Sequence, residues 1–432
     1  MLMAMAKAGI CIHAAMILIL SVLSAQASAG AANTMGPDIE KLNSKNTVLV
    51  VIDVQKYFIP GHPGAISPAI PGQNEALKLA NVLSLIRTAK KNGLNILVTF
   101  EGSKRGLEAM PDELSRELPA EGCAEFIKQY FDLTRKPGIS AALEKTGAEN
   151  ILVCGAETDV CVMQSATGLI RKGYNVFLAE DAVFTSTTLN EPALKRMQMA
   201  GVRIVKTAEA IRAIENSGIP VGAAGFEKRT PLPDIEAGRV AAVIINYDDK
   251  SLERAADPKK EQKKIRIGQL NHYAEVLEIP VYYLHAGRVD GLKKAMHLPT
   301  QVHFLEAAVS YPEPIKKLAV VLRDAKVSQV VLGGIEENTI VEGAVSLLVE
   351  SGLQVHVMED VVLEDGGTAE EGAFDNLYRA GAVPCSFKMF IYDATEGIQA
   401  VIKKRWREMF RAKLAKKEIL WVDELPFVRD SQ

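Results

Sequence analysis

Three residues in the first half of the chain have side chains that together could cleave an acyl bond: Asp53, Lys128 and Cys161. Asp53 ends a short apolar run, and Cys161 follows another apolar run and opens a helical pattern. Catalytic residues of doubly wound sheets come from the carboxyl ends of strands, so we expect these positions to meet at one sheet edge. A thiol at the start of a helix meets free N–H groups and the positive end of the helix dipole, which favour the thiolate.

The chemistry that these groups predict is nucleophilic acyl transfer. Asp53 would remove the thiol proton and return it to the leaving amine, while Lys128 would hold the charge of the carboxylate. The backbone N–H groups of Val160 and Cys161 would form an oxyanion hole, worth about 3 kcal/mol per donor. Each side chain also has an inert interpretation when taken alone: an aspartate that caps a loop, a solvated lysine and a small buried thiol.

Further residues near these positions are candidates for contact with a small-molecule substrate. Lys104 and Arg105 follow the second predicted strand and could line the pocket. The four principal candidates for substrate contact are Gln55, Phe58, Glu101 and Glu157.

The elements that must position these side chains are short Val/Ile/Leu runs that alternate with longer helical patterns. This alternation is typical of βαβ units around a mostly parallel, doubly wound sheet. Near-continuous apolar strands imply burial on both faces, which predicts a three-layer α/β/α fold. In the first half, the expected strands are 48–53, 95–100, 150–155, 175–179 and 203–206, and the expected helices are 74–91, 139–146, 162–172 and 192–200.

The second half of the chain repeats the first. Residues 151–181 align with 330–360 without a gap, so that Gly155 meets Gly334 and Glu157 meets Glu336. The same strand–turn–helix–Gly–strand unit is therefore written twice, which predicts a tandem duplication of the fold.

The second copy lacks the reactive groups of the first. Asn246 stands at the position of Asp53, Ile340 at that of Cys161, and Ala307 roughly at that of Lys128. An amide cannot act as a carboxylate base, and neither alanine nor isoleucine supplies a charge or a nucleophile. We expect the second copy to be catalytically silent and to support the first as an internal partner.

The segments VVIDVQ, GAETDVCV and KGYNVFLAEDA, together with Lys128, resemble the isochorismatase-like cysteine hydrolase superfamily. The resemblance covers about 46–214 well and 239–401 as a degenerate copy. It implies an Asp–Lys–Cys triad that cleaves amide and related C–N bonds through a thioester, here Asp53, Lys128 and Cys161. It also implies a non-proline cis peptide bond near the cysteine loop.

Departures from the family pattern narrow the expected activity. Isochorismate-cleaving members typically lack the nucleophilic cysteine, so the resemblance and Cys161 together favour an amidase. Nicotinamidases of the family carry an Asp-x-His metal motif after the second strand, where this chain has FEGSKRG instead. We therefore expect no metal and no other cofactor.

The two ends of the chain lack the strand–helix alternation. Residues 14–23 are almost entirely apolar and are followed by Ala27-Ser28-Ala29, a pattern that signal peptidase reads. We expect residues 1–29 to be a signal peptide and the mature protein to be exported, to a periplasm or to the outside. The other expected boundaries are a catalytic domain at 40–216, a linker at 217–238, a degenerate domain at 239–400 and a basic C-terminal helix and tail at 401–432.

Composition restricts the partners. The chain has 50 basic and 53 acidic side chains and a formal charge of −3, which argues against a nucleic-acid partner. No segment after the leader reaches the ~18 uninterrupted apolar residues of a membrane span, so no integral membrane segment is expected after cleavage. The expected partners are a small-molecule substrate and either the internal second copy, as a pseudo-dimer, or further copies in a homo-oligomer.

The sequence leaves two alternatives to a cysteine amidohydrolase. One is a non-catalytic binding or scaffold protein of the same fold, which would require Cys161 to be unreactive or disulfide-bonded, for example to Cys154. The other is a vinyl ether hydrolase of the isochorismatase type.

Overall fold

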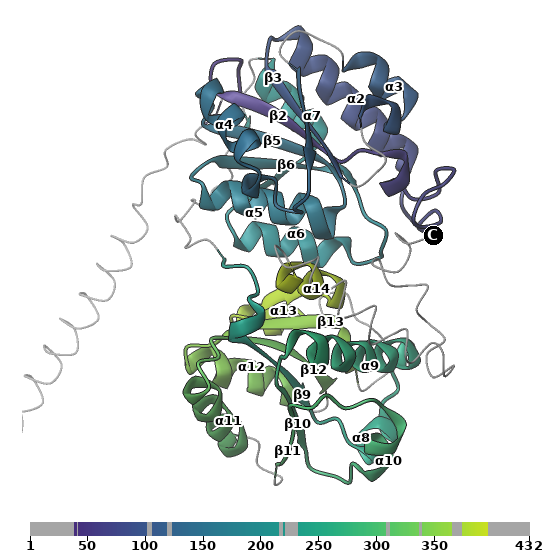
Figure 1. Cartoon of the computed structure of the whole chain (residues 1–432), viewed down its shortest axis with the longest axis vertical. Helices are drawn as coiled ribbons and strands as arrows, with labels where there is room; N and C mark the ends of the chain where they lie inside the picture. Colours follow the sequence, from purple (N-terminus) through teal and green to yellow (C-terminus); the bar gives the residue numbers. More distant parts are fainter. Residues whose placement is uncertain are drawn as a thin grey trace, which may run out of the picture.

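The computed structural model describes residues 39–395 except 41, 102–105, 119–122, 216–218, 221–231, 308–311, 337–338 and 365–373. Within these residues, two six-stranded sheets form the framework, one in each half of the chain (Figure 1). Every strand pair within the two sheets is parallel. The expected signal peptide and the expected C-terminal helix and tail lie outside the described residues.

The first sheet has the strand order β4-β3-β2-β5-β6-β7. Its strands are β2 (Thr47–Ile52), β3 (Asn95–Glu101), β4 (Cys123–Lys128), β5 (Asn150–Ala156), β6 (Asn175–Phe184) and β7 (Arg203–Val205). Its α-helices are α2 (Glu75–Lys91), α3 (Asp112–Glu117), α4 (Pro137–Thr146), α5 (Met163–Arg171), α6 (Asn190–Met199) and α7 (Thr207–Ile214).

Both faces of this sheet are covered by helices because its central strands are apolar on both sides. Along β2, Leu49 and Val51 pack with α2 and α7, whereas Val50 and Ile52 pack with α4, α5 and α6. Alternate side chains of a strand point to opposite faces, so one continuous apolar run supplies both layers of the core. The expected three-layer α/β/α fold is confirmed.

The second sheet repeats this order as β11-β10-β9-β12-β13-β14. Its strands are β9 (Val240–Ile245), β10 (Val281–His285), β11 (Val302–Glu306), β12 (Gln329–Glu336), β13 (Gln354–Glu364) and β14 (Val383–Cys385). Its α-helices are α8 (Asp249–Arg254), α9 (Lys260–Leu277), α10 (Asp290–Ala295), α11 (Pro312–Asp324), α12 (Ile340–Glu350), α13 (Asp375–Arg379) and α14 (Phe387–Thr395). The expected tandem duplication is therefore confirmed.

The duplication extends to one demanding backbone position. Gly155 and Gly334 both have positive φ, +131° and +138°. A Cβ at Gly155 would lie 2.0 Å from the carbonyl oxygen of Ile52, and one at Gly334 would lie 2.1 Å from that of Ile245. Each glycine therefore allows its strand to approach the central strand of its own sheet at the same point.

One apolar cluster runs through both domains. It joins the α4, α5 and α6 side of the first sheet to the α9 and α14 side of the second. By chain order α9 and α14 correspond to α2 and α7, so the two domains meet through non-equivalent faces. The internal pair is therefore not a two-fold symmetric dimer, in which the same surface of each partner would meet.

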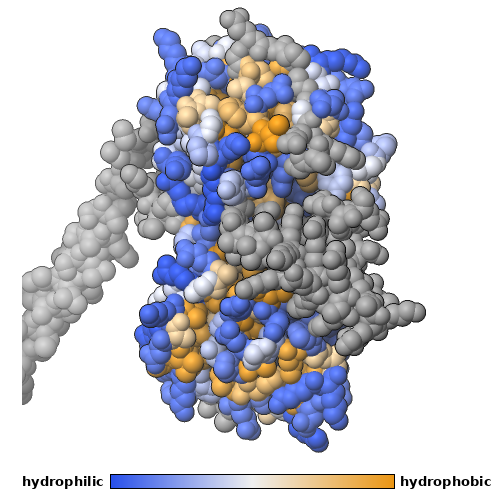
Figure 2. All heavy atoms as spheres, in the orientation of Figure 1, coloured by the Kyte–Doolittle hydropathy of each residue, from blue (hydrophilic) through white to orange (hydrophobic). Residues whose placement is uncertain are grey.

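The outer surface of the two domains carries many hydrophilic side chains. Hydrophilic side chains cover much of both domains in the view of Figure 2, and the hydrophobic areas between them are smaller. Among the described residues, no helix is both long enough and apolar enough to cross a bilayer.

Strand β4 is the main element that the sequence patterns missed. Lys128 ends this strand, which pairs with β3 at the edge of the sheet. Its other residues, CAEFI, are only partly buried or exposed, so the strand lacks the apolar run that marked the central strands. Helix α7 was also not expected.

Candidate active site

Four side chains converge at the carboxyl edge of the first sheet: Asp53, Glu101, Lys128 and Cys161. Asp53 directly follows β2, Glu101 and Lys128 end the neighbouring strands β3 and β4, and Cys161 lies in the segment after β5. The parallel register places Glu101 beside Lys128, so the order β4-β3-β2-β5 brings the four groups together.

Lys128 lies at the centre of this cluster. Its Nζ is 2.6 Å from Asp53 Oδ2, 3.3 Å from Cys161 Sγ and 3.4 Å from Glu101 Oε2. Burial opposes its charge, but the attraction of Asp53, Cys161 and Glu101 outweighs burial and raises the pKa of Lys128 well above its ordinary value. The ammonium therefore stays charged at neutral pH.

Asp53 is held by both its backbone and its side chain. It has a positive φ of 47°, a conformation that non-glycine residues adopt rarely and aspartate and asparagine adopt most readily. Its N–H donates to Thr99 O at 3.1 Å, and the Thr99 hydroxyl donates to its Oδ1 at 2.8 Å. The second carboxylate oxygen, Oδ2, is left to face Lys128.

Cys161 lies in a single π-helical turn, Thr158–Val162, that leads into α5. The peptide bond between Ala156 and Glu157 is cis, as the family resemblance implied. The thiol is 4% exposed and donates to Glu101 Oε2 at 3.0 Å. The described cysteines Cys123, Cys154, Cys161 and Cys385 are all free, so the disulfide to Cys154, one of the states expected for a non-catalytic scaffold protein, is not formed.

The resting thiol is not the stabilised thiolate that a helix N-terminus predicts. Burial raises the pKa of Cys161 well above its ordinary value, and the charge of Glu101 raises it further against the opposing effect of Lys128. Burial within this turn therefore opposes the thiolate that a helix N-terminus would favour. A base must therefore take the proton when the sulfur reacts.

One of the two predicted oxyanion donors, the N–H of Val160, already has a backbone partner. The Val160 N–H donates to Glu157 O at 3.1 Å, and the Val162 N–H shares that oxygen at 3.1 Å. Val160 could therefore donate to a substrate only if it gave up a bond within its own loop.

Some of the residues expected to contact substrate instead bind or pack against the residues around the cluster. Gln55 binds the backbone of Glu101 in both directions, since its Nε2 donates to Glu101 O at 2.9 Å and its Oε1 accepts from Glu101 N–H at 2.7 Å. Phe58 packs at the edge of the α2–α7 core. Lys104 and Arg105 lie outside the described residues.

Glu157, the fourth expected contact, faces a residue of the other domain. Its Oε1 accepts from the Ser186 N–H at 3.1 Å and from Lys388 Nζ at 3.0 Å. Lys388 belongs to α14 of the second domain, and nothing in its local sequence pointed to the site. Only the packing of the two domains brings it there.

Three groups of the cluster could in principle bind a metal ion. One ligand atom from each of Asp53, Glu101 and Cys161 lies within 4.8 Å of the others. The ammonium of Lys128, however, lies against all three and supplies the positive charge there. The donor set therefore fits the resident ammonium better than a metal ion.

The second sheet has none of these groups at the equivalent edge. Its register places Ala307 at the position of Lys128 and Ala286 at that of Glu101. Asn246 keeps the positive φ of Asp53, at 56°, but not its charge. Ile340 replaces Cys161.

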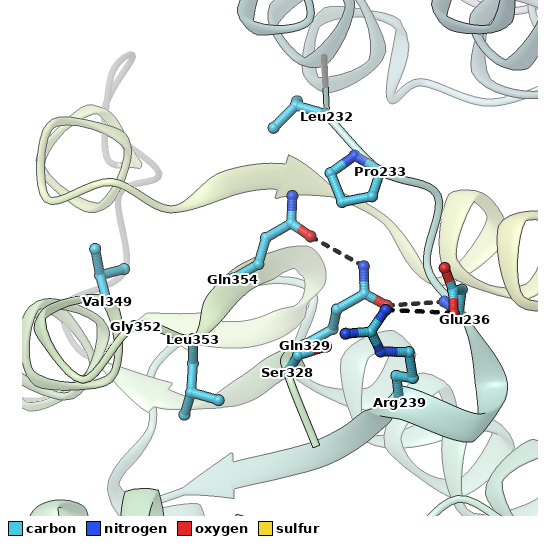
Figure 3. Close-up of a pocket in the computed structure, with 10 residues that line it drawn as sticks. All are labelled: Leu232, Pro233, Glu236, Arg239, Ser328, Gln329, Val349, Gly352, Leu353 and Gln354. Atoms are coloured by element: carbon cyan, nitrogen blue, oxygen red, sulfur yellow. Dashed lines mark hydrogen bonds and ion pairs between the residues drawn. The ribbon is translucent and has the colours of Figure 1, made fainter. Parts of the chain in front are cut away.

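A cavity in the second domain lies away from this chemistry. Gln329 and Gln354 begin β12 and β13, so the cavity is at the amino edge of the sheet (Figure 3). Gln329 donates to Gln354 Oε1 at 2.9 Å and accepts from the Glu236 N–H at 2.8 Å. These amides bind one another and anchor the chain that enters the second domain.

Comparison with known proteins identifies the family of the first domain. Residues 47–209 match the isochorismatase domain. The chain is 31% identical to the secreted isochorismatase effector Isc1 of Phytophthora sojae over 180 residues, which are 41% of this chain and 80% of that protein. It is 26% identical to the Isc1 effector of Verticillium dahliae over 180 residues, which are 40% and 90% of the two chains.

A solved structure, MAR1 ribonuclease from Caenorhabditis elegans, aligns with 42% of this chain and 87% of that chain, with 26% identity and a TM-score of 0.35. The family assignment rests on the sequence matches rather than on this alignment. The chain belongs to the isochorismatase family.

Proposed function

We propose that this chain is a hydrolase that uses Cys161 to cleave a small amide, ureide or related C–N bond. The proposal is carried by the position of the buried thiol, 3.0 Å from Glu101 and 3.3 Å from the ammonium of an Asp53–Lys128 pair. A nucleophile, a carboxylate that can take its proton and a fixed positive charge are what acyl transfer by cysteine requires.

The proposed first step transfers the thiol proton to Asp53 as the sulfur attacks the substrate carbonyl carbon. Collapse of the tetrahedral adduct breaks the C–N bond, and Asp53 gives the proton to the departing amine. Water, deprotonated by the same carboxylate, then attacks the thioester and releases the acid and the thiol. Lys128 stabilises the negative charge as it moves between Asp53 and Cys161.

The backbone before α5 would hold the oxyanion. The N–H of Cys161 is the first candidate donor, and the N–H of Val160 joins it if its bond to Glu157 opens. Donors fixed before the reaction are worth about 3 kcal/mol each at the transition state.

The exposure of the cluster supports an entry route for a small substrate. The side chain of Glu101 is 22% exposed, whereas those of Asp53 and Lys128 are 0% exposed. A substrate would therefore approach past Glu101 and displace the thiol–carboxylate hydrogen bond. Asp53, whose side chain is fully buried, would remain in place as the base.

A second candidate function is vinyl ether hydrolysis of the isochorismatase type. The match of residues 47–209 to the isochorismatase domain favours it. This reaction forms no thioester, so a variant without the thiol would retain turnover.

We also infer that the protein is exported. The Isc1 effectors of both organisms named above are secreted, and residues 1–29 of this chain have the composition of a signal peptide. The proposed domain boundaries remain 40–216, 217–238 and 239–400, with a basic helix and tail at 401–432.

The function is tested by screening the full mature chain against small amides, ureides and hydroxamates, with isochorismate included. Cys161→Ala should abolish amide turnover and leave the unfolding midpoint within a few degrees of wild type. Cys154→Ala, at a buried thiol outside the cluster, is the matched control and should retain turnover. Amide turnover by Cys161→Ala at the wild-type rate would refute the thioester mechanism.

A further inference from the structure

Helix α14 of the second domain packs against the segment that carries Cys161 in the first. Lys388 and Tyr392 are four residues apart on this helix, so their side chains lie on one face. Both reach residues of the first domain, and each does so near a different part of the active site.

Lys388 binds three groups around the cysteine loop. Its Nζ donates to Glu157 Oε1 at 3.0 Å, to Asp159 Oδ1 at 3.2 Å and to Ser186 Oγ at 3.0 Å. Glu157 and Asp159 are four and two residues before Cys161, and both are buried. One ammonium from the second domain therefore forms ion pairs with two buried carboxylates beside the nucleophile.

Among the described residues of the first domain, none forms an ion pair with Glu157 or Asp159. Within its own domain, Asp159 accepts hydrogen bonds from the hydroxyls of Thr185 and Thr187 at 3.0 and 3.2 Å. Hydroxyls orient a carboxylate but do not neutralise it. Without Lys388, two uncompensated negative charges would lie beside a thiol whose conversion to thiolate they oppose.

Tyr392 covers the site from the same helix. Its ring meets that of Phe131 edge to face, with centroids 4.7 Å apart, and Phe131 is three residues after Lys128. Both side chains belong to the apolar cluster that contains Val160 and Cys161. The phenol is also close enough to Glu157, Glu101 and Cys161 that their negative charges add to burial in raising its pKa.

We propose that the second domain completes the active site of the first, with Lys388 as a positioning residue for the Cys161 loop and Tyr392 as a wall that closes the site over the thiol. This inference rests on the proposed function of Cys161. It gives the second domain, which lacks the reactive groups, a role in the active site of the first. That role depends on the surface of α14 that contacts the first domain.

The test measures how fast iodoacetamide alkylates Cys161 in the full mature chain, as a function of pH, with the modified peptide identified by mass spectrometry. Lys388→Met should slow alkylation at neutral pH by about tenfold and shift the pH profile upward by about one unit, because a tenfold change in thiolate corresponds to one pKa unit. Lys388→Arg keeps the charge and should restore most of the rate.

Lys195→Met is the matched control for the domain interface. Lys195 of α6 pairs with Asp375 of α13 at 3.0 Å across the same interface, and this contact does not involve the cysteine loop. This variant should alkylate within about twofold of wild type, since exposed or half-exposed ion pairs contribute little.

The wall is tested with a bulkier reagent. Tyr392→Ala should speed alkylation by N-ethylmaleimide about tenfold more than it speeds alkylation by iodoacetamide. Tyr392→Phe keeps the ring and should match wild type with both reagents. A small opening of a packed aromatic wall is expected to affect the larger reagent most.

The outcomes separate this inference from the function on which it rests. If Lys388→Met alkylates with the wild-type rate and pH profile and Tyr392→Ala shows no size effect, the second domain is only a structural neighbour and the inference is wrong. If wild-type Cys161 is not alkylated at any pH at which the protein stays folded, the proposed function is wrong and this inference is wrong with it.

Discussion

The ammonium of Lys128 lies 2.6 Å from Asp53 Oδ2, and both side chains are fully removed from solvent. A buried ion pair of this kind adds little stability by itself, but loss of one partner leaves an uncompensated charge. We therefore expect Lys128→Met and Asp53→Asn each to destabilise the first domain by about 3–5 kcal/mol and to abolish turnover.

The double variant separates these two effects. Asp53→Asn combined with Lys128→Met removes both charges and should recover much of the lost unfolding free energy, but no activity. Denaturant unfolding and turnover, measured on the same four proteins, check both statements. Additive loss of stability in the double variant would contradict the ion pair.

Replacement of Glu101 should make the thiol more acidic without removing the proposed base, Asp53. The charge of Glu101 raises the pKa of Cys161, so Glu101→Gln should lower that pKa, enlarge the thiolate fraction below it and speed alkylation at neutral pH. Turnover should fall far less than in Asp53→Asn if Asp53 is the base. Glu125→Gln, at an exposed position of the neighbouring strand β4, should change neither rate.

The paired glycines predict matched losses of stability. Gly155→Ala and Gly334→Ala would each place a Cβ within 2.1 Å of a carbonyl oxygen at a positive φ, so each should unfold its own domain. Gly343→Ala, within α12 where the space is open, should instead stabilise the chain by about 0.5–1 kcal/mol. Denaturation monitored by circular dichroism measures all three, and a well-folded Gly155→Ala would contradict the close strand approach.

One carboxyl of the second domain predicts a pH dependence of stability. Burial raises the pKa of Glu336 to about 7 against an unfolded value of 4.5. The folded state therefore binds the proton more tightly, and stability should decline as pH rises from about 4.5 to about 7.

Glu336→Gln should remove part of that decline, on the order of 2 kcal/mol after allowance for partial exposure. Glu350→Gln, at the exposed end of helix α12 in the same domain, is the control. Chemical denaturation at pH 4.5, 6 and 8 measures the effect. An equal slope of stability against pH in both variants would contradict a raised pKa at Glu336.

Strong local patterns made most of the fold predictable. The central strands are almost wholly apolar, as in β2 and β5, and Gly93, Gly173 and Gly201 mark the ends of the helices before β3, β6 and β7. Strand β4 was not predicted because an edge strand with one solvated face carries no apolar run, so the sequence did not place Lys128 on a strand.

The sequence pointed to the residues of the candidate site, but not to the contacts that these residues make with one another. Asp53 and Cys161 stand out because they follow apolar strands, and the family resemblance supplied Lys128. That Glu101 rather than Asp53 directly receives the thiol hydrogen bond depends on the register of β3 against β4. Lys388 could not be found at all, because its contact with Glu157 spans 231 residues and exists only once two domains have packed.

The central claim is that Cys161 forms a covalent acyl intermediate. It is tested most directly by mixing the full mature chain with an amide that it turns over, quenching in acid within a single turnover, and measuring intact and peptide masses. The account predicts that the mass of the acyl group appears on the peptide containing Cys161 and is absent from Cys161→Ala. Undiminished turnover by Cys161→Ala, with no adduct on any wild-type cysteine, would contradict it.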